Sequence, residues 1–117
     1  MIARVPLDEG TLTGTLTRDS RWPETDWRSS YFTPEHLDAS VTRAERLAPL
    51  VPEGSSMADV ALRFILSSTD VSTVIPGMRR ARHVDANMAA SGRGPLPAEL
   101  VAALRGHRWD RTPNATP

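Results

Sequence analysis

The chain has 117 residues, of which 39% are hydrophobic, so it is long enough to form one domain with a core of its own. Its 14 basic residues are balanced by 14 acidic residues, which excludes a strong overall field towards nucleic acid or an anionic membrane. All the basic residues are arginine, and neither lysine nor cysteine occurs. Schiff-base chemistry, disulfides, thiol catalysis and cysteine-ligated zinc are therefore excluded.

No targeting or membrane segment is indicated by the sequence. The first ten residues, "MIARVPLDEG", contain no long apolar core and no small-residue cleavage site. No apolar run approaches the roughly 20 residues that a membrane span needs. We therefore expect a cytoplasmic protein that binds neither membranes nor nucleic acid.

The first half of the chain predicts a strand, a long loop and a helix. Residues 2–7 form a short apolar run that suits a buried strand. Residues 8–33 form a loop rich in Gly, Thr, Ser, Asp and Trp, and loops of that length are either functional or disordered. Thr33 as an N-cap, Pro34 at the first helical position and apolar residues at intervals of three and four predict a helix over 34–50.

A second helix and a second strand follow. Ser56 and Asp59 resemble a capping box that carries Asp in place of Glu or Gln, and they predict a largely buried helix ending near residue 67. Residues 72–75 are β-branched and predict a strand. Strands that alternate with helices are typical of parallel β-α-β geometry. Two strands cannot form a stable sheet alone, so we expect the sheet to need strands that this chain lacks.

Two further helices are predicted towards the C-terminus. The first runs over residues 80–90 with Val84, Met88 and Ala81 facing inward. The second runs over residues 97–105 and ends at a glycine.

The turn between the second strand and the helix after it predicts an anion site. Gly77 has no Cβ, so a ligand can approach the backbone, and the first amides of the helix favour negative charge. Arg79, Arg80 and Arg82 add forked donors that match phosphate. The alternative is a solvated first turn whose arginines face water. Arginine opposes the helix dipole at that position, which favours the bound anion.

These stretches carry a resemblance to a known family. "STVIPGMRRARHVDAN" (72–87) resembles the eighth strand, turn and eighth helix of the aldo-keto reductases, and "ARVPLDEGTLTG" (3–14) resembles their seventh strand and the following loop. "WPETDWRSSYF" and "LRGHRWDR" are similar to one bacterial branch of that superfamily. The resemblance implies an α/β fold in which residues 1–108 form the C-terminal part of a (β/α)8 TIM barrel. Residues 109–117 are polar, so we expect them to be a flexible tail.

The resemblance also implies a nicotinamide cofactor, and the arginines near Gly77 favour NADP(H) over NAD. Carried over by position, the residues along the nicotinamide ribose and pyrophosphate are Val5, Pro6, Leu7, Glu9 and Gly10. The residues that hold the adenosine 2'-phosphate are Gly77, Met78 and Arg79, and those that meet the adenine are His83 and Asn87. His83 replaces the Gln of many relatives, and Ala86 replaces their Glu, so we expect a looser adenine site.

Hydride transfer to a small-molecule aldehyde or ketone is the reaction that the resemblance implies for an intact family member. The implied catalytic set is Asp, Tyr, Lys and His from the first half of the barrel. This chain has no lysine, and its single tyrosine, Tyr31, lies in the loop after the seventh strand. We therefore expect part of the cofactor site without catalytic residues.

Two explanations of the short chain remain open. It is either the product of a truncated gene that starts at an internal Met1, or a short protein that pairs with an N-terminal partner chain or with itself. In the second case it is a non-catalytic interaction or structural subunit that completes a partner's barrel.

Other candidate sites are weaker. The histidines His36, His83 and His107 are scattered over three elements, so no metal site is predicted. The acidic residues Asp19, Glu24 and Asp26 suggest either paired carboxylates for hydrolysis or solvated loop residues that pair with Arg21 and Arg28. The aromatic residues Trp22, Trp27, Tyr31 and Phe32 either pack the loop onto the barrel wall or line a substrate pocket.

Overall fold

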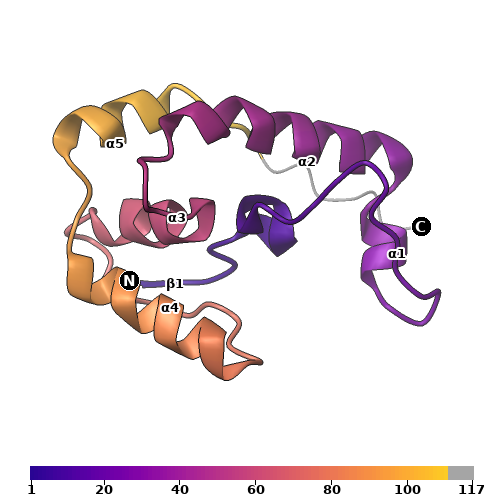
Figure 1. Cartoon of the computed structure of the whole chain (residues 1–117), viewed down its shortest axis with the longest axis horizontal. Helices are drawn as coiled ribbons and strands as arrows, with labels where there is room; N and C mark the ends of the chain where they lie inside the picture. Colours follow the sequence, from indigo (N-terminus) through magenta and orange to yellow (C-terminus); the bar gives the residue numbers. More distant parts are fainter. Residues whose placement is uncertain (111–117) are drawn as a thin grey trace.

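The computed structural model describes residues 1–110, and its helices lie around a small sheet (Figure 1). Helices α2 (Pro34–Leu47) and α5 (Ala98–Arg105) run along one side of the molecule. Helix α3 (Met57–Leu66) lies in the middle, and α4 (Ala81–Arg93) forms the opposite side. Within the described residues, the sheet has two strands.

The two strands pair in parallel, as the sequence predicts. Strand β1 (Ile2–Ala3) lies beside β2 (Thr73–Val74), with Ile2 opposite Thr73. The ladder is extended by the Ser72 amide, which donates to the Met1 carbonyl at 2.8 Å, and by the Ile75 amide, which donates to the Ala3 carbonyl at 3.0 Å. Both strands are shorter than the predicted ranges 2–7 and 72–75, so those boundaries were wrong.

The first strand ends early because the backbone turns at Val5. Val5 has a φ of 51°, which is a rare conformation for a β-branched residue, and the following Pro6 has no amide to donate to a ladder. The chain then forms a 3-10 helix, η1 (Asp8–Thr13), that is kinked at Glu9 and Gly10. The predicted loop therefore contains regular structure, including a short helix, α1 (Arg28–Tyr31).

The predicted helix over 34–50 is confirmed as α2 followed by a 3-10 turn, η2 (Ala48–Leu50). The Thr33 side chain accepts a hydrogen bond from the His36 amide at 3.2 Å, so it is the N-cap that the sequence predicts. The inward stripe of α2 consists of Leu37, Val41 and Leu47, which are all buried.

Helix α3 begins with half of the predicted capping box. The Ser56 hydroxyl accepts from the Asp59 amide at 3.0 Å, but the Asp59 carboxylate lies 3.4 Å from Arg63 and 3.2 Å from Arg93. Arg63 also donates to the Gly94 carbonyl at 2.9 Å. Asp59 therefore links α3 to the C-terminal end of α4 through a largely buried cluster of charges.

The inward face predicted for the helix over 80–90 is wrong. Ala81, Val84 and Met88 are all exposed, Met88 by 66%, whereas Ala90 is buried at 1%. Helix α4 packs against α3, and no element of the described chain covers the Val84 and Met88 face. Val84 and Met88 are four residues apart and so share one face of α4, which is exposed within residues 1–110.

The C-terminal helix is confirmed as α5, with Gly106 at its end. The guanidinium of Arg43 lies over the Trp109 ring, 5.2 Å from its centroid, so the start of the predicted tail 109–117 contacts α2. The remainder of that tail, residues 111–117, lies outside the described residues.

Removal of the buried Asp59 carboxylate should cost more free energy of unfolding than removal of an exposed ion-pair partner. Asp59→Ala removes the partner of two arginines and should lower the free energy of unfolding by about 2–3 kcal/mol. Asp110→Ala breaks the exposed pair with Arg108 and should change it by less than about 0.5 kcal/mol. Urea denaturation of both variants measures this difference, and equal losses would contradict the structural role of Asp59.

Candidate cofactor site

The two groups of residues predicted to bind the cofactor lie at one edge of the sheet. The first group follows the carboxyl end of β1 and consists of Val5, Pro6, Leu7, Glu9 and Gly10. The second follows the carboxyl end of β2 and consists of Gly77, Met78, Arg79, His83 and Asn87. Because the strands are parallel neighbours, their carboxyl ends meet, and this edge is where α/β folds bind ligands.

The segment after β1 is a tight turn with an unusual backbone. Val5, Asp8 and Glu9 have φ values of 51°, 48° and 57°, and Gly10 has a φ of 112°. The turn is held by its own amides, since Gly10 and Leu12 both donate to the Leu7 carbonyl, at 3.1 and 3.0 Å. Positive φ at three non-glycine residues stores strain, and such strain clusters at ligand sites.

The segment after β2 is an open turn that leads into α4. A Cβ added at Gly77 would meet no atom within 4 Å, so the space beside this backbone is free for a ligand. The Asn87 amide group donates to the Gly77 carbonyl at 3.2 Å and ties the turn to the second turn of the helix. Arg80, the N-cap residue, makes no side-chain cap, and the His83 and Val84 amides donate to its carbonyl at 2.9 and 3.2 Å. The two amides before these, those of Ala81 and Arg82, are the ones available to an anion.

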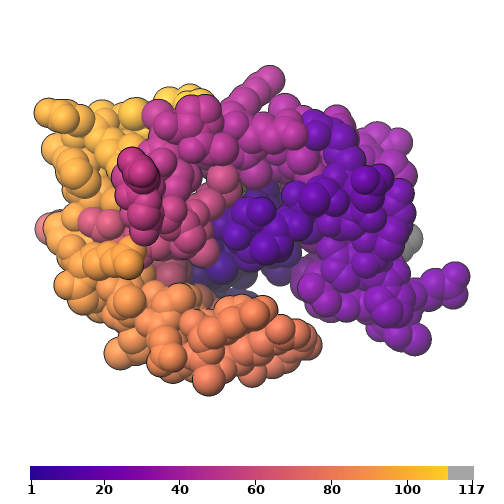
Figure 2. All heavy atoms as spheres, in the orientation of Figure 1, coloured from indigo at the N-terminus to yellow at the C-terminus, as the bar shows by residue number. Residues whose placement is uncertain are grey.

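Three arginine side chains lie at this turn, and no carboxylate of the described residues forms an ion pair with them. Arg79, Arg80 and Arg82 are exposed, and none of the ion pairs within residues 1–110 involves them. The space-filling view shows an open hollow between α4 and the loop before α2, with the N-terminal segment at its back (Figure 2). Three exposed arginines therefore lie at this turn, and none has an acidic partner in an ion pair within residues 1–110.

The adenine residues are less clearly organised. His83 is exposed, and Asn87 is half-buried and bonded to Gly77. Met78, predicted to hold the 2'-phosphate, is also exposed. Ala86 is also exposed and has no side-chain group that could hydrogen-bond a base. The structure thus brings the predicted residues to one edge, and of the two adenine candidates Asn87 is the one that bonds to another predicted residue, Gly77.

The aromatic residues of the loop pack mainly against α2. Trp22 stacks on Phe32 with ring centroids 4.9 Å apart, and Tyr31 meets Phe32 edge-on at 4.8 Å. Phe32 is buried with Leu37 and Val41 in a core cluster. Of the two alternatives for these residues, packing of the loop is therefore observed for Trp22, Tyr31 and Phe32.

The Arg18 side chain fixes the same loop to α2 through a set of hydrogen bonds and ion pairs, here called the Arg18 clamp. The sequence did not predict this contact. Arg18 donates to Asp38 at 2.7 Å, to Glu45 at 2.8 and 3.1 Å, and to Thr42 at 3.1 Å. These hydrogen bonds raise the pKa of Arg18 and lower that of Glu45. The partners lie 20 to 27 residues from Arg18, so no local motif could indicate the contact.

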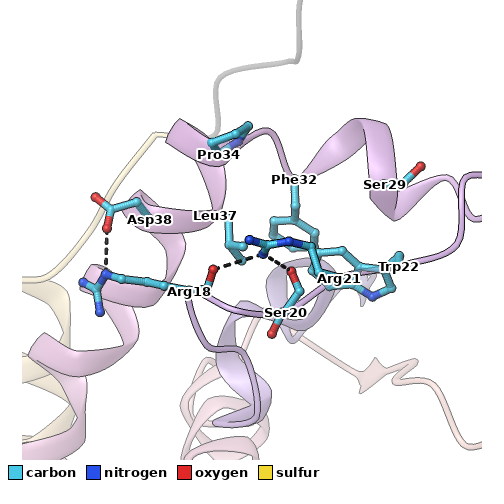
Figure 3. Close-up of a pocket in the computed structure, with 9 residues that line it drawn as sticks. All are labelled: Arg18, Ser20, Arg21, Trp22, Ser29, Phe32, Pro34, Leu37 and Asp38. Atoms are coloured by element: carbon cyan, nitrogen blue, oxygen red, sulfur yellow. Dashed lines mark hydrogen bonds and ion pairs between the residues drawn. The ribbon is translucent and has the colours of Figure 1, made fainter.

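One acidic residue of the loop pairs with an arginine of the same loop. Asp26 pairs with Arg28 at 2.6 Å, as one of the two alternatives predicts. Arg21 instead donates to the carbonyls of Arg18 and Ser20 at 3.1 and 2.7 Å, and it borders a hollow of about 360 Å³ between the loop and α2 (Figure 3). The loop is therefore anchored on α2 by arginine contacts as well as by aromatic packing.

Residues 1–110 contain no group of three or more metal-ligating side chains placed to hold an ion. No helix among these residues is both long and apolar enough to cross a membrane.

Tyr31, the single tyrosine, lies against His36 with ring centroids 4.6 Å apart and belongs to the loop packing.

Comparison with known proteins gives a consistent result. The Aldo/keto reductase family model matches residues 1–108. The L-glyceraldehyde 3-phosphate reductase of Escherichia coli O157:H7 is 30% identical over 115 residues, covering 93% of this chain and 33% of that protein. The chain thus spans about a third of the length of this curated relative. No solved structure matches the chain.

The Asp26 and Arg28 pair predicts a pH dependence of the loop. Hydrogen bonds from the Arg28 side chain and amide lower the pKa of Asp26 from 3.8 to about 2. The pair therefore contributes fully above about pH 4 and is lost as the pH falls through about 2. A carbon NMR titration of the Asp26 carboxyl should give a pKa near 2, and Arg28→Ala should return it towards 3.8. An unchanged pKa in the variant would contradict this pairing.

Proposed function

The chain belongs to the aldo/keto reductase family, and from this premise we propose that it supplies the adenosine end of an NADP(H) site. The matched region covers the whole edge at which the two turns meet. In this proposal the chain is the C-terminal part of a (β/α)8 barrel in a protein that reduces aldehydes or ketones. Phosphate sites in such barrels often lie after the seventh and eighth strands, the positions assigned to β1 and β2.

The observation that carries the proposal is the unpaired arginine cluster beside an open glycine turn. Gly77 leaves room for a phosphate against the backbone, and the first amides of α4 point positive partial charge towards it. Arg79 lies two residues from Gly77 and presents a forked donor that matches phosphate oxygens. The residues present therefore fit the 2'-phosphate that distinguishes NADP(H) from NAD(H).

The turn after β1 suits the central part of the cofactor. Its backbone is held in a fixed, strained shape by bonds to the Leu7 carbonyl, so its amides and carbonyls are pre-oriented. In the proposal, Val5, Pro6 and Leu7 lie along the nicotinamide ribose, and Glu9 and Gly10 lie along the pyrophosphate. Pro6 is buried and gives this turn a rigid base.

The chemistry itself belongs largely to residues that this chain does not contain. When bound, the reduced cofactor supplies a hydride for the carbonyl carbon of an aldehyde or ketone. The family's general acid is a tyrosine assisted by a lysine, whereas this chain has no lysine and its one tyrosine packs in the loop. We therefore assign binding of the cofactor, and no proton transfer, to the chain, and we expect it to act in the cytoplasm.

A second candidate function is a non-catalytic subunit that completes a partner's barrel. The observation that favours it is the bare apolar surface of the sheet and of α4. Ile2, Ile75 and Met88 are exposed by 62%, 53% and 66%. Faces of this kind are normally covered by another element or another chain.

The cofactor proposal predicts discrimination between NADPH and NADH. NADPH should bind the purified chain more tightly, and Arg79→Ala should weaken NADPH binding about tenfold while leaving NADH binding nearly unchanged. Arg46→Ala, which changes an exposed arginine of α2, is the matched control and should bind NADPH as the parent does. Titrations that follow cofactor fluorescence measure these affinities. Absence of NADPH binding, or equal binding by the Arg79 variant, would refute the proposal.

A further inference from the structure

The hollow between α2 and the loop that precedes it combines an apolar wall with one arginine. Its volume of about 360 Å³ lies within the range of about 300–1,000 Å³ in which small-ligand sites fall. Arg21 borders it, and the apolar side chains that line it are Trp22, Phe32, Pro34 and Leu37 (Figure 3). Sites with this lining hold a ligand through its apolar body and orient it through a few polar contacts.

The apolar wall is ordered by the core beneath it. The Trp22 and Phe32 rings are stacked, with centroids 4.9 Å apart and an interplanar angle of 17°. Phe32 and Leu37 are each 5% exposed and belong to one buried cluster, against which Trp22 packs. A wall that is already ordered loses little conformational freedom when a ligand binds. The hollow therefore suits a small ligand with a flat, apolar body.

The Arg21 guanidinium keeps two nitrogens for a ligand. Its Nη1 atom donates to the Arg18 carbonyl at 3.1 Å and to the Ser20 carbonyl at 2.7 Å, which uses both hydrogens of that nitrogen. The Nε and Nη2 atoms make no hydrogen bond or ion pair with any residue of 1–110. These two nitrogens form one edge of the guanidinium, the fork that matches the two oxygens of a carboxylate. The bonds to the two carbonyls restrain the orientation of this fork before a ligand binds.

A second hollow also borders Arg21, and its lining differs. It has a volume of about 270 Å³ and lies beside Glu9 and Gly10. Its lining is mainly polar, with Leu16 and Trp22 as the large apolar side chains. A ligand with an apolar body therefore favours the hollow beside α2, where four apolar side chains meet.

We propose that the hollow beside α2 binds a small planar carboxylate, whose two oxygens accept from Nε and Nη2 of Arg21 and whose flat body lies against Trp22 and Phe32. Asp38 is the carboxylate that lines the same hollow, and Arg18 binds it at 2.7 Å. Asp38 therefore repels an anionic ligand less than an unpaired carboxylate would. None of the residues assigned to the cofactor lines this hollow, so the site is separate from the proposed function.

Benzoate is the probe for this site, because it carries a carboxylate on one flat apolar ring. In a titration of the full chain at constant ionic strength, the NMR signals of the Trp22 indole and the Leu37 amide should shift saturably. The expected dissociation constant is on the order of 1 mM. Benzamide has the same shape without the charge, and acetate has the carboxylate without the ring. Each should bind at least about tenfold more weakly than benzoate.

Variants of Arg21 test the role of the fork. Arg21→Gln removes the fork and should weaken benzoate binding at least about tenfold, and Arg21→Lys, which keeps the charge without the fork, should also weaken it. Arg46→Gln is the matched control, because Arg46 is an exposed arginine of α2 that does not line the hollow, and it should bind benzoate as the parent does.

The comparison of benzoate with benzamide needs no variant, so it tests the site even if Arg21→Gln disorders the loop. Equal binding of these two compounds or absence of a saturable shift would overturn the proposal. Full benzoate binding by a folded Arg21→Gln variant, or shifts centred on Gly10 or Gly77 in place of Leu37, would overturn it as well.

Discussion

The parallel pairing of β1 with β2 is the contact on which the site depends. It involves two residue pairs, Ile2 with Thr73 and Ala3 with Val74, and backbone bonds at each end. The pairing brings together two turns that are about 70 residues apart in the chain, the strained turn after β1 and the open turn at Gly77. Without that pairing the arginines near Gly77 would be an isolated basic helix start, and one turn alone could not follow an extended dinucleotide.

The rest of the structure has one part that is fixed by ion pairs and aromatic packing, and another part whose apolar side chains are exposed. The loop before α2 is fixed by the Arg18 clamp and by aromatic packing, and α3 is joined to α4 through Asp59. By contrast, one face of the sheet and one face of α4 expose large apolar side chains. The proposal of a subunit that completes a partner's barrel rests on these uncovered apolar faces. The cofactor proposal rests instead on the exposed arginines beside Gly77.

Sequence patterns predicted the helices well where capping residues and apolar spacing agree. Thr33 and Ser56 cap α2 and α3 as expected, and Gly106 ends α5. The strand lengths and the kinked turn at Glu9 were not predictable, because a positive φ at Val5 has no signature in a β-branched residue. Val84 and Met88 show a different limit. Their spacing correctly marks an apolar face, but no pattern can tell whether the covering partner lies in the same chain.

The most direct test of the cofactor site uses adenosine 2',5'-bisphosphate, which carries the adenine and the 2'-phosphate without the nicotinamide. A titration followed by amide NMR measures which residues respond to this ligand. Saturable shifts should be confined to the amides from Gly77 to Arg82 and to His83 and Asn87, with none in α2 or α3. Shifts scattered over other exposed arginines such as Arg46, or no saturable shift at all, would contradict the assignment of the 2'-phosphate to this turn.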